Sequence, residues 1–171
     1  MNDIKNELKN YIKNNLEKVK RNKSFLFGKM SSILYDECEE AYSERTCSNI
    51  NDYINKHNEY SDFQTMLFKL IDDRKLKDSE VYNKVHIDRR LFSKIRSDKN
   101  YHPSKETIIL LAIALELSEE ELDNLLDSAS YSLPKNNKYD LIIRFCFINK
   151  IFKLSDINEL LDDYNCKLFN Y

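Results

Sequence analysis

The sequence predicts an all-α protein, and two observations support this prediction. The 171 residues include one Gly and two Pro, which are too few for the many tight turns of a sheet protein. Apolar residues recur at spacings of three and four along most of the chain, as they do in helices with one buried face. The hydrophobic fraction of 42% and the charged fraction of 33% are typical of a folded chain with a core.

The N-terminal region, residues 1–60, is expected to form helices followed by a linker. A first helix over residues 3–20 has one apolar stripe, made of Ile4, Leu8, Tyr11, Ile12, Leu16 and Val19. We expect a second helix over residues 24–43. Residues 46–61 are polar and rich in Asn, so this stretch is interpreted as a linker that holds a short helix.

The middle of the chain, residues 61–133, predicts five helices in close succession. The expected helices cover residues 63–71, 78–84, 88–97, 104–115 and 118–127. Asp88 and Ser104 are suitable N-cap residues. Ser118 and Glu121 match the Ser-x-x-Glu capping box, which marks the start of the last of the five.

The C-terminal extension, residues 134–171, predicts two further helices, over residues 138–150 and 155–163. Leu141, Phe145 and Ile148 recur at helical spacing, so we expect them to close the core of the chain. Cys146 lies inside the apolar run LIIRFCF and is interpreted as a buried core residue.

Positive charge is concentrated in one part of a chain whose net charge is −2. Residues 84–105 contain seven Lys and Arg residues, against the two carboxylates of Asp88 and Asp98. Acidic residues gather elsewhere, in residues 36–44, 119–127 and 156–163. Segregated charge of this kind can steer a polyanion to one face of a protein. The alternative is that each run is a solvated helix face, in which the cations pair with carboxylates of neighbouring helices.

Helical spacing divides the basic helix over residues 88–97 into two sides. Phe92 and Ile95 lie three residues apart and are expected to face the core, where Val81, Val85 and Ile87 would hold the preceding helix. The outward side then carries Arg89, Arg90, Ser93, Lys94 and Ser97. Arg is suited to bidentate contact with guanine, and Lys and Ser to contact with phosphates.

The succession of spacings from Phe63 to Asp127 resembles the helix-turn-helix domain of the Cro/lambda-repressor (XRE) family. The resemblance includes Pro103 before Ser104-Lys105-Glu106-Thr107 and the stretch Ile113-Ala114-Leu115. It implies a five-helix lambda-repressor-like domain, here with an N-terminal helical region and two extra C-terminal helices. In this family the second short helix lies in the DNA major groove.

The resemblance also implies roles for individual residues. Residues at the start of the recognition helix read bases, which maps onto Arg89, Arg90 and Ser93. Residues just beyond the helix clamp the DNA backbone, which maps onto Lys99 and Tyr101. The sequence departs from the family pattern at Tyr82, His86 and Arg96, and Asp78 adds a carboxylate that we expect to repel DNA locally.

The function expected from these features is binding of double-stranded DNA, as a transcriptional regulator of a bacterium, phage or mobile element. The alternative is a protein-binding adaptor or inhibitor, for example in phage–host defence, that uses the same scaffold to dock on another protein. Arg89 and Arg90 suit that alternative too, because Arg is enriched at protein interfaces.

Enzymatic chemistry has no support in the sequence. Motifs for a Gly-rich phosphate loop, a nucleophile elbow or a zinc protease are missing, and the Cys and His spacings do not suit zinc. We therefore expect no enzyme, no cofactor and no metal. The chain shows no signal peptide at Met1 and no apolar run of about 20 residues, so we expect a cytoplasmic protein that binds no membrane.

A homodimer is expected, because repressor-type domains read two half-sites about one helical turn of DNA apart. We expect the C-terminal helices to make the dimer contact in preference to the N-terminal pair of helices. The apolar residues left for a partner would then be Ile142, Phe147, Leu168 and Phe169.

Overall fold

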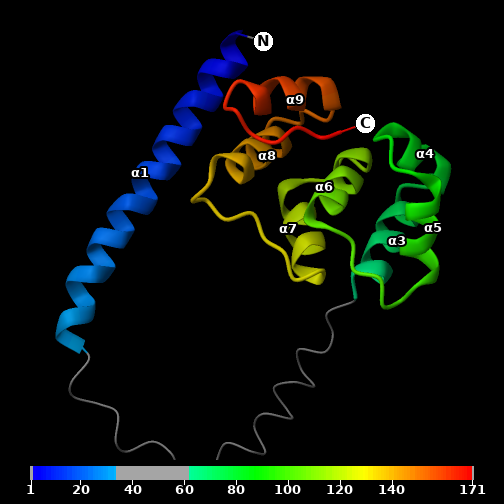
Figure 1. The fold of residues 1–171 in the computed structure, drawn as a ribbon, viewed down its shortest axis with the longest axis horizontal. Helices are drawn as coiled ribbons and strands as arrows, with labels where there is room; N and C mark the ends of the chain where they lie inside the picture. The colour runs from blue at the N-terminus through cyan, green and yellow to red at the C-terminus, as the bar shows by residue number, and fades with distance from the viewer. Residues whose placement is uncertain (1, 34–61, 171) are drawn as a thin grey trace, which may run out of the picture.

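A computed structural model describes residues 2–33 and 62–170 and shows an all-α architecture, as the sequence predicts (Figure 1). These residues form eight helices and no strand. The helices are α1 (Asn2–Ile33), α3 (Phe63–Asp73), α4 (Asp78–Lys84), α5 (Arg89–Ser97), α6 (Lys105–Ala114), α7 (Glu119–Ser128), α8 (Lys138–Ile148) and α9 (Leu154–Asp162). The helices predicted from residue 63 onward are all present, with bounds that differ by a few residues.

Side chains that accept hydrogen bonds from the first turn explain where several helices begin. Ser104 caps α6 by accepting from the Thr107 amide, and Asn137 caps α8 by accepting from the Asp140 amide. The capping box predicted for α7 is confirmed. Ser118 accepts from the Glu121 amide, and the Glu121 carboxylate accepts from the Ser118 amide. Such caps satisfy backbone N–H groups that have no partner within the helix.

Six helices end in the same way although glycine is absent from their C-termini. In each, one residue adopts a left-handed conformation with φ between 52° and 58°. The next amide donates to a carbonyl five residues earlier, as Leu117 N does to Ala112 O in α6. This is the Schellman arrangement, in which glycine is the usual left-handed residue. The six left-handed residues are Lys75, His86, Glu116, Ser130, Lys150 and Asn165.

The core lies around α6 and α8. In α6 the buried residues cover nearly the whole helix, from Ile108 to Ala114 with Leu110 half-buried, and it packs against α4 and α7. In α8 every residue from Asp140 to Phe147 is buried, and α1, α7 and α9 pack against it. A helix that is apolar on all sides is a central helix.

Buried charges in this core are paired. Arg144 on α8 donates to Glu119 at 2.6 Å and to Asp123 at 2.8 Å, both on α7. Hydrogen bonds to these carboxylates, first to Asp123, raise the pKa of Arg144 against the opposing effect of desolvation. Asp140, which is 2% exposed, accepts from Lys105 at 2.6 Å. These pairs join α6, α7 and α8, because an unpaired buried charge would be strongly destabilising.

One prediction about the N-terminal region is wrong, and two others fall wholly or partly outside the described residues. Helix α1 continues through residue 24 to Ile33, so the expected break between two helices is wrong up to that point. The polar stretch before residue 24 contains no Pro or Gly that would end a helix. Residues 34–43 of the expected second helix, and the linker over residues 46–61, lie outside the described residues.

The residues predicted to remain for a dimer partner are mostly covered within the chain. Ile142 is 0% exposed, Phe147 3% and Phe169 5%, so the prediction for these three residues is wrong. Only Leu168 of the predicted set is exposed. Ile148, predicted to close the core, is also exposed. Ile142 and Phe147 are buried because α8 is contacted from several sides, and α1 covers one of these sides.

Among the described helices, none combines the length and the apolar character needed to cross a membrane.

Candidate nucleic-acid interface

Helices α4 and α5 are short, consecutive and joined by a four-residue turn over residues 85–88. Val81, Val85 and Ile87 are buried, as predicted, and they fix α4 and the turn to the core. His86 lies between two of them in the left-handed region with φ 56°. The amide of Ile87 donates to the Tyr82 carbonyl at 2.9 Å, which closes the end of α4.

Helix α5 is anchored by two buried side chains. Phe92 is 2% exposed and Ile95 is 0% exposed, which confirms that they face the core. Phe92 contacts the rings of Phe68 and Tyr82, at centroid distances of 6.2 and 5.6 Å. Tyr82 therefore fills the space between α4 and α5 with an aromatic ring that packs on Phe92.

Asp88 sets the start of α5. Its carboxylate accepts from the Arg90 amide at 2.6 Å and from the Leu91 amide at 3.4 Å, so the predicted N-cap is confirmed. The cap places Arg89 and Arg90 in the first turn of the helix. Because Phe92 and Ile95 hold the opposite side, both arginine side chains lie at the surface.

The structure brings the predicted site residues together on α5 and the segment that follows it. The exposed members are Arg89, Arg90, Ser93, Lys94, Ser97 and Lys99. Tyr101 is half-buried, and the Lys94 ammonium lies 4.4 Å from the centroid of its ring. A cation over an aromatic face is held by the ring quadrupole, so this contact joins the end of α5 to the segment beyond it.

Three cations of the basic segment are paired with carboxylates. Lys84 lies 2.5 Å from Glu116, Lys105 lies 2.6 Å from Asp140, and Arg96 lies 2.5 Å from Asp78. In contrast, Arg89, Arg90, Lys94 and Lys99 make no ion pair with any residue that the structure describes. Of the paired cations, Arg96 lies on α5 itself, whereas Lys84 and Lys105 lie on α4 and α6.

Arg96 has a role that the sequence did not indicate. Its guanidinium lies over the Phe68 ring at 4.0 Å while it donates to Asp78. The carboxylate of Asp78, expected to repel DNA, thus has a cation beside it. The sequence carried no signal for this pair, because it depends on how α4 and α5 are placed across the space between them. A hollow of about 410 Å³ lies there, with Arg89 and Ser93 among its lining residues.

Lys99 lies near the start of α3. The pKa of Asp62 is lowered mainly by hydrogen bonds from Thr65, and the positive charge of Lys99 lowers it further. Gln64 on the same helix donates to the Asp98 carbonyl. The segment after α5 is therefore tied to the first turn of α3, which limits where Lys99 can reach.

Cys146 is buried on α8, as predicted, and burial raises the pKa of its thiol to about 12. A thiol in this state is a weak nucleophile. Among the described residues, the structure contains no group of three or more His, Cys, Asp or Glu side chains that could hold a metal ion.

Comparison of the chain with protein-family models, with curated proteins and with solved structures finds no match.

Proposed function

We propose that the chain binds double-stranded DNA through the outward face of α5 and regulates transcription. The observation that supports this proposal most is the set of four exposed cations, Arg89, Arg90, Lys94 and Lys99, that form no ion pair in the described part of the chain. Of these four, Lys99 acts on the Asp62 carboxylate through its charge alone. Neighbouring cations of the same segment are neutralised within the chain. A phosphate backbone would supply the missing negative charge.

The arrangement of α5 suits this role. A short helix with two anchored apolar residues presents its other side rigidly, which is what base readout in a groove requires. Arg89 and Arg90 would contact base edges from the first turn, and Ser93 would lie one turn further along. Lys94 and Lys99 would contact phosphates of the DNA backbone. The acidic residues Glu119, Glu120 and Glu121 lie on α7 and not on α5.

A gel-shift on genomic fragments tests the assignment to α5. We expect the double variant Arg89→Ala with Arg90→Ala to lose affinity by about 1–3 kcal/mol for each base contact removed. The matched control is Lys69→Ala with Lys135→Ala, which also removes two exposed cations, on α3 and in the loop before α8. Equal DNA binding by the arginine variant and by the control would refute the assignment.

Lys94→Ala and Lys99→Ala test the phosphate roles. Each change should weaken binding to all sequences about equally and should reduce the salt slope by about 1. A changed sequence preference with an unchanged salt slope would contradict these roles. If no fragment binds in a salt-dependent way and one protein co-purifies at fixed stoichiometry, the adaptor alternative replaces DNA binding.

A further inference from the structure

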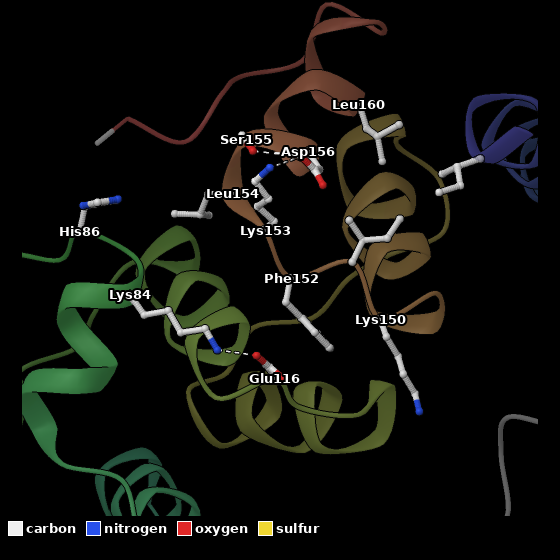
Figure 2. Close-up of a pocket in the computed structure, with 12 residues that line it drawn as sticks. Lys84, His86, Glu116, Lys150, Phe152, Lys153, Leu154, Ser155, Asp156 and Leu160 are labelled. Carbon is white, nitrogen blue, oxygen red and sulfur yellow. Dashed lines mark hydrogen bonds and ion pairs between the residues drawn. The ribbon is translucent and has the colours of Figure 1, made fainter. Parts of the chain in front are cut away.

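Ion pairs hold both ends of α4. At its C-terminal end, Lys84 pairs with Glu116 at 2.5 Å, on one side of a hollow of about 910 Å³ (Figure 2). At its N-terminal end, Asp78 pairs with Arg96 of α5 at 2.5 Å. The lining of the first hollow contains no residue of α5, whereas Arg89 lines the hollow of about 410 Å³ that the second pair also lines. The second pair can therefore act on a residue that we expect to contact DNA.

Asp78 is the only carboxylate among the described residues that line the hollow beside Arg89. Arg89 and Arg96 are seven residues apart on α5, so their side chains enter this hollow from one face of the helix. Asp88, which precedes Arg89, is engaged as the N-cap by the backbone amide of Arg90. Two guanidinium groups thus compete for one carboxylate. Arg96 holds it, and Arg89 makes no ion pair with any described residue.

The Phe68 ring explains why Arg96 keeps the carboxylate. The Arg96 guanidinium lies 4.0 Å from the centroid of this ring, which itself packs edge-on against Phe92. Stacking on an aromatic ring already restrains the guanidinium, so pairing with Asp78 costs Arg96 little further side-chain freedom. Arg89 is exposed, and pairing would immobilise its long side chain. The entropy cost therefore favours Arg96 as the partner of Asp78.

We propose that Arg96 is a positioning residue, which withholds the Asp78 carboxylate from Arg89 and so leaves Arg89 available to a base. The inference rests on the proposed binding of DNA by α5 and deepens it, because it names a residue that sets the specificity of the site. Without Arg96, the Asp78 carboxylate would pair with Arg89 inside the hollow. The Arg89 guanidinium would then no longer be free to donate both of its hydrogen bonds to guanine.

The DNA affinities of the wild type, Arg96→Met, Asp78→Asn and the double variant test this role. Arg96→Met, which keeps an apolar side chain on Phe68, should weaken binding to the preferred fragment about tenfold, as for the loss of one base contact. Asp78→Asn should restore this loss about tenfold in the Arg96→Met background, because only there does Asp78 bind Arg89. In the wild-type background Asp78→Asn should change the affinity by about twofold or less.

An effect of charge alone would make Asp78→Asn equally large in the two backgrounds, because independent changes add. A purely structural role of the ion pair would make Asp78→Asn and Arg96→Met equally harmful, since each breaks the same pair. Either of these results would overturn the proposal.

NMR of the arginine side-chain nitrogens, on the full chain without DNA, separates this inference from DNA binding itself. An ion pair restrains rotation of a guanidinium, so Arg96 should give the restrained signal in the wild type, and Arg89 in Arg96→Met. The matched control is Lys69→Met, which removes an exposed cation of α3 outside the hollow and should leave the Arg89 signal unchanged. An unrestrained Arg89 in Arg96→Met would overturn the inference. If the wild type bound no DNA fragment, the proposed function would fail, and the NMR result would still decide which arginine Asp78 binds.

Discussion

At the scale of single residues, the left-handed positions at helix ends are the most repeated feature of the chain. Lys75 is a simple example, because it is exposed and follows Arg74, the C-cap residue of α3. A residue with a Cβ is strained in this region by roughly 1–2 kcal/mol, whereas glycine is not. Glycine in turn loses more backbone entropy on folding, by about 0.5–1 kcal/mol. The relief of strain is slightly larger than the cost in entropy, so glycine should be slightly more stable than lysine at this position.

Lys75→Gly should therefore raise the free energy of unfolding by about 0.5 kcal/mol, from the relief of strain at the end of α3. The matched control is Lys69→Gly, also an exposed lysine but inside α3, which should lower the free energy of unfolding by about 1 kcal/mol. Urea titration followed by circular dichroism measures both. A decrease at both positions would contradict the left-handed conformation of Lys75.

The sequence contained a signal for these helix ends, but not the usual one. Without glycine at the left-handed position, the readable feature is the apolar residue that follows it, such as Leu76, Ile87 or Leu117, which packs back on the helix. The same limit applies to the candidate site. Phe92, Ile95 and the Asp88 cap could be predicted from spacing. The Arg96–Asp78 pair could not, because it depends on how α4 and α5 are placed in space.

At the scale of elements, α1 and α8 differ most from what the sequence predicted. Leu8 is 0% exposed and Ile12 5%, so the predicted stripe of α1 is buried within the chain. The Tyr11 ring contacts Phe145 of α8 at 5.6 Å, and Lys5 pairs with Glu159 at 2.7 Å. The stripe could be predicted from its period. Its partner could not, because periodicity shows that a face is apolar and does not show what covers it.

The sequence of α8 contains a stronger signal than the helical spacing of Leu141, Phe145 and Ile148. Its run from Leu141 to Phe147 is apolar on all sides except at Arg144, which pairs with α7. Such a helix is expected to be central, with neighbours on more than one side. The spacing of Leu141, Phe145 and Ile148 selected one side and left Ile142 and Phe147 for a partner outside the chain. In the structure α1, α7 and α9 occupy those sides.

Leu8→Ala tests whether α1 packs on α8 in solution. Removing a fully buried Leu side chain should lower the free energy of unfolding by about 2–5 kcal/mol. Lys13→Ala on the exposed side of α1 is the control, and it should change stability by less than about 0.5 kcal/mol. Chemical denaturation of both variants measures the difference. If Leu8→Ala behaved like Lys13→Ala, α1 would not be docked on the rest of the chain.

At the scale of the whole molecule, the expected dimer needs an apolar surface that is not buried within the chain itself. The two large apolar residues that remain exposed among the described side chains, Ile148 at 45% and Leu168 at 38%, lie on the C-terminal part. Two residues of this size supply little of the roughly 800 Å² that each partner usually contributes to a stable interface. Helix α1, in contrast, continues past the helices on which its first half packs (Figure 1).

The exposed apolar side chains of the C-terminal helices are therefore too few to account for the dimer that we expect, and the place of the dimer contact stays a prediction. Sedimentation of the full chain at micromolar concentration should give a dimer, as a two-fold DNA site requires. The double variant Ile148→Glu with Leu168→Glu, which places charge on the remaining C-terminal apolar surface, should sediment as the wild type does. A monomeric variant would show that the C-terminal helices make the dimer contact. A monomeric wild type would remove the dimer, and with it the simplest way for α5 to read a two-fold site.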